Sequence, residues 1–400
     1  MMPQRRVRER IRRAFGPVAC LTGIAAVVAA LVLIGCMAAS PATASAHQAS
    51  GPAKPAVGSD GPFERVGVPI GIGGYGDPIF SANSRRFIAS NGRGEHVRVW
   101  DVSTLKPLCD PLPDTGPAWG LTFDGKIAFT TDWQSVRFWN VDTSKPTCVT
   151  KVTDGKLNDL AISPDGSQFL TIVDGEQAMG VWRTGEERPR LIIKRDVVWA
   201  AFNPTGTRIV THAGWDTRVF SAETGKEVCP PIISYSNILP EFAELFDPTG
   251  RWLIVYEYDG IMVVDVTIGK TCFEVPLDRP WTASSEESKY VHWAPDSSKF
   301  VVAYGENFFH PHPARIYDAA TGKLERTVGT NVAECWIGPG TRYALGRSGR
   351  SFDSFDLVNL RDGRRVQTLK LHNALVSPDC STIVEAPEDG PDVIWRMQQK

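Results

Sequence analysis

The sequence predicts an all-β fold built from repeated four-stranded units, preceded by an apolar N-terminal segment. Three observations support this prediction: a recurring proline turn, a recurring large apolar residue, and short β-branched and aromatic runs between them. With 42% hydrophobic residues, 36 Gly and 29 Pro in 400 residues, the composition suits many short strands joined by tight turns.

The first repeated feature is a turn of the form apolar-x-Pro-x-x. Proline pre-sets φ for the turn, and Asp, Thr or Gly completes it, so each copy marks a reversal between two strands. The turn recurs at Pro164, Pro204, Pro248, Pro295, Pro339 and Pro378, with degenerate copies at Ala82–Ser84 and Asp124–Gly125.

The second feature is a large residue, often followed by Asp or Asn, some 16 to 22 residues after each turn. A period near 40 with runs such as Thr207–Thr211 and Gly260–Val264 indicates about four short strands per unit, as in one blade of a β-propeller. These landmarks are Trp100, Trp139, Trp182, Phe220, Val264, Tyr317, Val358 and Trp395.

Counting landmarks predicts eight blades, with seven blades and one irregular unit as the alternative. The last unit ends after its third strand, at Val393–Met397, so its outer strand is missing there. We expect Phe63–Ile70 to supply that strand and close the ring, because an open propeller would expose sheet edges on its first and last blades.

Upstream of the repeats, residues 18–39 form a 22-residue apolar run, long enough to cross a bilayer. Six arginines precede it within the first 13 residues, which predicts a cytoplasmic N-terminus and an extracytoplasmic body. The predicted organisation is a signal sequence or membrane anchor (1–46), a flexible linker (47–61) and the propeller (62–400).

Three fates of this segment stay open. Leu33–Cys36 resembles a lipobox, in which Cys36 would be lipidated. Ala44–Ala46 resembles a signal-peptidase site that would release a secreted protein. An uncut anchor, which keeps the protein on the cytoplasmic membrane, is the third fate.

Charge disfavours direct nucleic-acid binding. The first 13 residues carry a net +5, and the whole chain carries −2, so the remainder carries about −7. A mildly acidic body without a basic stripe in the sequence neutralises phosphates poorly.

Four cysteines recur at similar places in successive repeats, in the predicted outer strands. Equivalent strands of neighbouring blades splay too far apart for a disulfide, so we expect buried small side chains there. These residues are Cys109, Cys148, Cys229 and Cys272.

The repeats resemble those of the WD40 family over roughly residues 62–400. The Gly-His pair typical of that family is missing, and its Trp-Asp pair is intact only at Trp100-Asp101, as in a diverged bacterial-type member. The similarity is carried by Val97–Asp101, Leu160–Gly166, Ala201–Gly206 and Ile316–Lys323.

The WD40 resemblance implies candidate binding residues at the rim of the central channel. Trp119, Trp199 and Tyr290 stand shortly before the first-strand motifs of three blades. The alternative is that these side chains fill space between blades, where large residues are also needed.

A second candidate is the loop Glu306–Pro313, which makes the gap from turn to landmark 22 residues in the sixth unit, against 16 in the fourth and fifth. Phe308 and Phe309, beside His310 and His312, would form an aromatic anchor for a partner. In the alternative, both Phe side chains pack on the flanking blade. His310 and His312 would face the same way in an extended segment, but two ligands do not make a metal site.

The sequence shows no nucleophile elbow, phosphate-binding loop, HExxH or EF-hand pattern, so we expect no enzyme activity and no cofactor. The favoured function is an extracytoplasmic scaffold for a protein or peptide partner. One alternative is a quinoprotein-like dehydrogenase, because Tyr317–Lys323 is similar to part of the tryptophan-docking motif of those enzymes, although the closing Trp is missing. Another is a ligand sensor coupled to an uncleaved N-terminal anchor.

Overall fold

The computed structural model describes residues 61–66, 79–90, 97–112, 118–132, 134–173, 178–213, 216–233, 245–257, 260–276, 289–304, 312–329, 332–348, 353–371, 374–385 and 393–398. The chain divides into two units, Met1–Ala56 and Val57–Lys400. The first unit, which includes the predicted anchor and Cys36, lies outside the described residues. Within the described ranges, no helix has the length and hydrophobicity needed to cross a bilayer.

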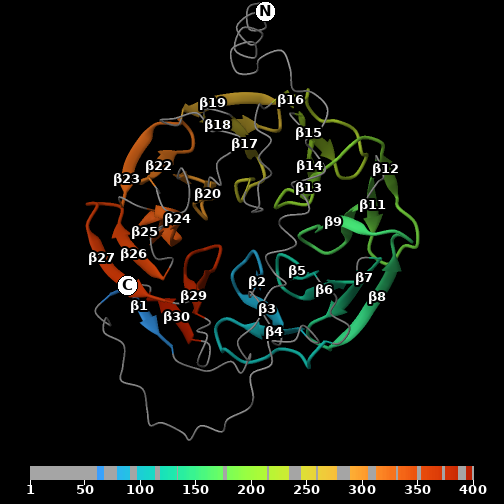
Figure 1. Cartoon of the computed structure of the whole chain (residues 1–400), viewed down its shortest axis with the longest axis horizontal. Helices are drawn as coiled ribbons and strands as arrows, with labels where there is room; N and C mark the ends of the chain where they lie inside the picture. Colours follow the sequence, from blue (N-terminus) through green and yellow to red (C-terminus); the bar gives the residue numbers. More distant parts are fainter. Residues whose placement is uncertain are drawn as a thin grey trace, which may run out of the picture. The chain divides into compact units, whose positions relative to one another are not determined.

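The unit Val57–Lys400 is an eight-bladed β-propeller (Figure 1). We number the blades along the chain and call their strands a to d from the channel outward. The predicted all-β class and the count of eight rather than seven blades are confirmed.

The strands of blades 1 to 4 run in chain order within each sheet. Blade 1 holds β2 (Ile79–Phe80), β3 (Arg86–Ser90) and β4 (Val97–Asp101); blade 2 holds β5 (Ala118–Leu121), β6 (Ile127–Thr131), β7 (Ser135–Asn140) and β8 (Lys145–Lys151); blade 3 holds β9 (Leu157–Ile162), β10 (Gln168–Val173), β11 (Met179–Arg183) and β12 (Leu191–Ile193); blade 4 holds β13 (Trp199–Phe202), β14 (Arg208–Ala213), β15 (Asp216–Ser221) and β16 (Ile232–Ile233).

Blades 5 to 8 repeat this order, except that the outermost strand of blade 8 is β1. Blade 5 holds β17 (Trp252–Glu257), β18 (Gly260–Asp265) and β19 (Lys270–Pro276); blade 6 holds β20 (Lys289–Trp293), β21 (Lys299–Tyr304), β22 (Ala314–Asp318) and β23 (Leu324–Val328); blade 7 holds β24 (Val332–Ile337), the short 3₁₀ turn η1 (Pro339–Thr341), β25 (Tyr343–Ser348), β26 (Ser354–Asn359) and β27 (Arg365–Lys370); blade 8 holds β28 (Ala374–Val376), β29 (Thr382–Glu385), β30 (Val393–Met397) and β1 (Phe63–Arg65).

Two blades have three named strands each. In blade 1 the place of strand d is taken by a segment that makes isolated bridges at Pro107 and Leu112. In blade 5 the place of strand a is taken by a segment that bridges Phe246 to Leu253. Both segments are held by backbone hydrogen bonds, so the radial arrangement is kept where regular pairing is interrupted.

The ring is closed by the N-terminal strand, as the sequence predicted. Phe63 pairs with Met397 and Arg65 with Trp395, which makes β1 the outer strand of blade 8. The Gln367 amide, from strand d of blade 7, holds the closing strand: it accepts from the Phe63 N–H and donates to the Phe63 carbonyl, both at 2.8 Å. Since Phe63 is fully buried, the closing strand also contributes to the core.

The a–b turns are held by polar side chains at their first position. In blade 3, the Ser163 hydroxyl donates to Asp165 at 2.7 Å and accepts the Gln168 N–H at 2.9 Å. A buried polar side chain at this position satisfies backbone groups that would otherwise lack partners. The equivalent residues of five other blades make the same i to i+5 bond: Ser81, Thr122, Asn203, Asp247 and Ser377.

The landmark residues all lie on strand c, the third strand of each blade, and all are buried except Trp395, which is half-buried. In blade 3 the Trp182 indole N–H donates to the Thr171 hydroxyl at 2.8 Å, and Trp139 repeats this bond to Thr130 at 3.2 Å in blade 2. In blade 1 an alanine occupies the acceptor position, and Trp100 keeps only the stacking on a buried phenylalanine that Trp182 also shows.

The recurring cysteines meet the expectation only in part. Cys109 and Cys229 are buried, Cys148 is half-buried, and Cys272 is exposed. Burial of Cys272 was predicted wrongly, because outer-strand side chains that alternate away from the neighbouring blade face solvent.

In blades 2 to 5 the a–b turn packs against the a–b turn of the preceding blade. A Cβ atom on Gly166 would lie 2.8 Å from Thr122 Cγ2, and one on Gly250 would lie 2.5 Å from Asn203 Nδ2. Only glycine fits beneath these polar side chains, and both glycines also have a positive φ.

In blades 6 to 8 the sizes of the residues at the first and fourth positions of the a–b turn are exchanged between neighbouring turns. Blades 6 and 7 have Ala294 and Gly338 at the first turn position, where other blades have a larger polar residue. At the position of the missing glycine, the following turns carry Thr341 and Cys380. In these turns a side chain on one turn is matched by a small residue on the neighbouring turn. Ser297, which follows Asp247, and Ser84, which follows Ser377, do not keep this pairing.

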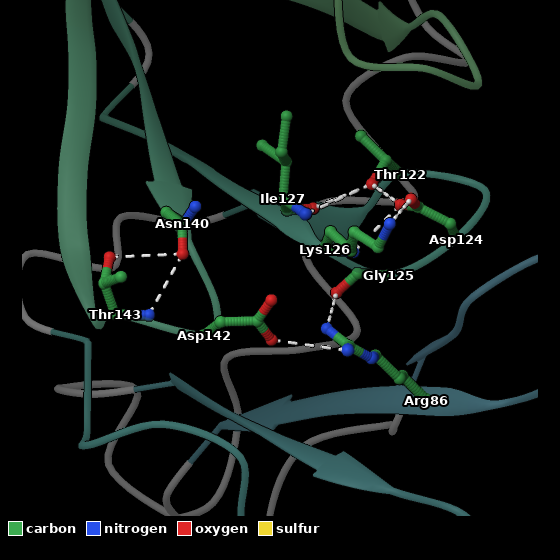
Figure 2. A network of polar contacts seen from close by, with 9 residues as sticks. All are labelled: Arg86, Thr122, Asp124, Gly125, Lys126, Ile127, Asn140, Asp142 and Thr143. Carbon is green, nitrogen blue, oxygen red and sulfur yellow. Dashed lines mark hydrogen bonds and ion pairs between the residues drawn. The ribbon is translucent and has the colours of Figure 1, made fainter.

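Arginine side chains add polar contacts between blades. Arg86 of blade 1 donates to the Gly125 carbonyl at 3.1 Å and pairs with Asp142 at 3.3 Å, so that it holds both turns of blade 2 (Figure 2). Arg396 of blade 8 donates to the carbonyl groups of Val102 and Ser103 in blade 1. The second contact lies at the closure of the ring.

Replacing Gln367 by Leu should lower the free energy of unfolding by about 2 to 4 kcal/mol, because two buried backbone groups of Phe63 lose their partner. Equilibrium urea unfolding measures the change. Val366→Ala, at a partly exposed site on the same strand, is the control and should change stability by less than about 1 kcal/mol. Equal effects of the two substitutions would contradict the role of the Gln367 amide.

Gly250→Ala and Gly340→Ala form a matched pair. Both residues have a positive φ, 73° and 65°, but a Cβ on Gly340 meets no atom within 4 Å. We expect a loss of about 1 kcal/mol for Gly340→Ala from backbone strain and about 1 to 2 kcal/mol more for Gly250→Ala, which displaces Asn203. Thermal unfolding measures the stability of the two variants. An equal loss in both would contradict the close packing of Gly250 against Asn203.

Candidate functional site

The inner strands line the central channel and have open edges toward it (Figure 1). Backbone N–H groups on such an edge need partners other than a neighbouring strand. Two polar side chains of strand a, from blades 3 and 6, reach the strand a of the next blade. They are Asp159 on β9 and His292 on β20.

Asp159 connects blades 3 and 4. Its carboxylate accepts the Leu160 N–H at 2.8 Å and the Ala200 N–H, on strand a of blade 4, at 3.3 Å. Burial raises the pKa of Asp159 above its ordinary value, and these two hydrogen bonds partly oppose the increase. None of the described lysines or arginines pairs with it.

His292 connects three blades. Its Nδ1 accepts the Ile337 N–H of blade 7 at 3.4 Å, and its Nε2 lies 3.0 Å from the Pro378 carbonyl of blade 8. This pattern assigns the proton of the neutral ring to Nε2. With 1% of its surface exposed and both nitrogens engaged, the ring acts as a structural connector rather than as a base or ligand.

The rim candidates all lie on strand a. Trp199 pairs with His212, and its half-buried side chain packs against the core cluster that includes Phe246 of blade 5, as in the space-filling alternative. Trp119 pairs with Thr130 and Tyr290 with Ala303, while the side chains of these two lie outside the described residues.

The loop candidates fall between β21 and β22. Phe308, Phe309 and His310 lie outside the described residues, while His312 is half-buried and its carbonyl accepts the Val332 N–H at 3.0 Å. The described ranges contain no group of three metal-ligating side chains. The proposed role of this loop in binding stays a prediction.

The cysteines of blades 7 and 8 are poor nucleophiles. Burial raises the pKa of Cys335 to about 12 and raises that of Cys380 well above its usual range. The motif that resembled a tryptophan-docking sequence forms an ordinary c–d turn: Asp318 accepts the Thr321 N–H at 2.8 Å, as Asp101 accepts the Thr104 N–H in blade 1.

Sequence reasoning missed Asp159 and His292. Neither belongs to a motif, because each acts on a backbone group about 40 residues further along the chain or more. A polar residue within an inner strand, followed directly by a large apolar residue, is the signal that could have marked both positions.

The chain matches no family model and no curated protein. A solved structure described as the crystal structure of the eukaryotic initiation factor is similar in fold, with a TM-score of 0.57 and 16% identity. The match covers 80% of this chain and 84% of that chain. Because 1619 chains of solved structures match, the fold does not single out a function.

Replacing Asp159 by Asn should stabilise the protein at neutral pH and raise Tm by about 1 to 3 °C. The folded protein raises the pKa of this carboxyl, so its ionised form costs stability above that pKa, and the cost disappears as the pH falls through it. Asparagine keeps an acceptor for the Ala200 N–H without the charge. Thermal unfolding at pH 7 and at about pH 4 checks this: the gain should shrink at the lower pH, and a constant gain would contradict it.

Proposed function

We propose that this protein is an extracytoplasmic scaffold built on diverged WD40-like repeats, which binds a protein or peptide partner and performs no catalysis. The observation that carries the proposal is the rigid closed ring, in which side-chain hydrogen bonds connect successive blades. Such a ring can present connecting loops in fixed positions.

The two faces of the ring differ, and the difference indicates which face binds. The a–b and c–d turns meet at one face, which we call the turn face. The a–b turns have five residues between their named strands, and the c–d turns of blades 2, 5, 6 and 7 have four or five, while those of blades 3 and 4 have seven and ten. The b–c and d–a connections join strand ends at the opposite face, and their lengths vary widely. Variable loops on a rigid ring are typical of a binding surface, so we assign the partner to this loop face.

The sequence of the loop face supports a partner segment that carries positive charge. Within the b–c and d–a connections, the residues outside the described ranges include 15 Asp or Glu and 3 Lys or Arg. An acidic set of loops favours encounter with a positively charged surface or peptide.

Localisation follows from the N-terminal segment. We propose that residues 18–39 export the propeller and hold it at the cytoplasmic membrane, with a secreted or Cys36-lipidated form as the alternative. Mass spectrometry of the native N-terminus separates these forms, and only an uncut segment permits the sensor function. A chain that starts at residue 1 but fractionates with the cytosol would refute export.

Crosslinking in the native envelope, followed by identification of the captured proteins, tests the scaffold function. Replacing both Phe308 and Phe309 by Ala should reduce capture of the partner by about tenfold or more, as expected for an aromatic anchor. Ile192→Ala, at an exposed site on an outer strand, is the control and should leave capture unchanged. Capture that is insensitive to the loop variant would remove this loop from the site, and absence of any specific partner would refute the scaffold.

A further inference from the structure

The turn face carries an uneven distribution of charge. The positions compared are the residues of the a–b and c–d turns of each blade and, at each end of a turn, the nearest strand residue that is paired with the other strand. In blades 2 to 6 these positions hold 11 cationic residues and 11 carboxylates, and the two balance within each blade. In blades 7, 8 and 1 they hold seven cationic residues and three carboxylates.

Most of the excess cations are exposed. One of the seven, Arg86, is half-buried in a contact between blades. The other six, which we call the tether-side patch, are exposed, and one of them, Arg365, also pairs with Asp356 on strand c of the same blade at 3.5 Å. The patch consists of Arg85, Lys106, Arg342, Arg361, Arg364 and Arg365.

The chain enters the propeller within this patch. Phe63, the first residue of β1, pairs with Met397 at the turn-face end of blade 8, and the Pro62 carbonyl accepts the Gln398 N–H at 2.7 Å. Blade 8 lies between blades 7 and 1 (Figure 1). The apolar segment 18–39 therefore precedes, through a linker, a point in blade 8 that has the cations of blade 7 on one side and those of blade 1 on the other.

An exposed aromatic residue borders the patch. Phe123, in the a–b turn of blade 2, is 43% exposed, whereas most other blades have a proline there. Its carbonyl accepts the Asn83 N–H of blade 1 at 3.2 Å, which places it beside the blade 1 turn. Cations next to an exposed phenylalanine are typical of surfaces that meet the headgroup region of a bilayer.

We propose that the tether-side patch binds anionic phospholipid headgroups, with Phe123 entering the interface. This inference rests on the proposed membrane tether. The patch would be a second, weaker attachment, which a nearby anchor makes effective by keeping the propeller close to the surface.

The charge of the rest of the propeller favours lipid over a free polyanion. Residues 14–400 carry about −7, so a nucleic acid approaching from solution meets a net repulsive protein. A membrane held against the turn face interacts mainly with that face, because charges more than about 8 Å away are screened at physiological salt.

Co-sedimentation of residues 57–400 with vesicles tests the proposal without the apolar segment. This fragment contains every described strand, including the closing strand β1, and corresponds to one compact unit. We expect binding to vesicles of phosphatidylcholine with about one-third phosphatidylglycerol, weakened by added salt, and much less binding to phosphatidylcholine vesicles. Equal binding to both vesicles, or binding to neither, would overturn the proposal.

A pair of triple variants separates the patch from net charge. Replacing Arg85, Arg361 and Arg364 by Glu should reduce binding on the order of tenfold or more, since each cation near an anionic surface contributes substantially. The control replaces three exposed turn-face lysines of balanced blades, Lys226, Lys270 and Lys323, by Glu, which changes the net charge equally. The control should bind within about twofold of the wild type, and equal loss in both variants would refute a localised patch.

Three further measurements complete the test. Thermal unfolding must show that both triple variants fold. Phe123→Ser should weaken vesicle binding. Ile268→Ser, at an exposed turn residue of blade 5, is its control and should leave vesicle binding unchanged. Duplex DNA that competes as well as anionic vesicles would reassign the patch to nucleic acid and overturn the lipid proposal. Capture of the partner by the loop face is measured separately, so loss of lipid binding with capture intact would refute this inference and leave the scaffold function standing.

Discussion

Every blade of this protein needs a neighbour on each side, and the rest of the structure depends on that constraint. Each sheet has two apolar faces, and the core clusters accordingly extend across successive blades: one extends from blade 4 through blade 6 and another from blade 6 to the closing strand. A blade at an open end would expose one face and one edge to water. The ring therefore has to close, and a strand from the beginning of the chain completes its last blade.

Because the ring has to close, the few residues of β1 are important for the stability of the propeller. The three residues of β1 supply the outermost strand of blade 8. Gln367, on the outermost strand of blade 7, hydrogen-bonds the backbone N–H and carbonyl of Phe63. Short closing strands contribute little by pairing, so the buried Phe63 side chain and the Gln367 amide supply the remaining stabilisation.

The repeat period made the fold predictable, since turn prolines and strand c landmarks recur wherever a blade must reverse and pack. The closing strand was predictable for the same physical reason, because unpaired edges are unfavourable. The irregular places in blades 1 and 5 were not predictable, since their segments keep backbone hydrogen bonds without regular pairing. The channel contacts of Asp159 and His292 also required coordinates, because their partners belong to other blades.

The tether-side patch was hidden in the sequence for a further reason. Its members fall near residues 85 to 106 and 342 to 365, at opposite ends of the propeller sequence, and only ring closure brings them together. Summed over the sequence, residues 14–400 are mildly acidic. This net charge gives no information about how cations are distributed between the two faces of the ring. Since the chain enters at the turn face, an anchor upstream of residue 57 would leave the variable loops of the opposite face free. Attachment and partner binding would then occupy different ends of the same strands and would not compete.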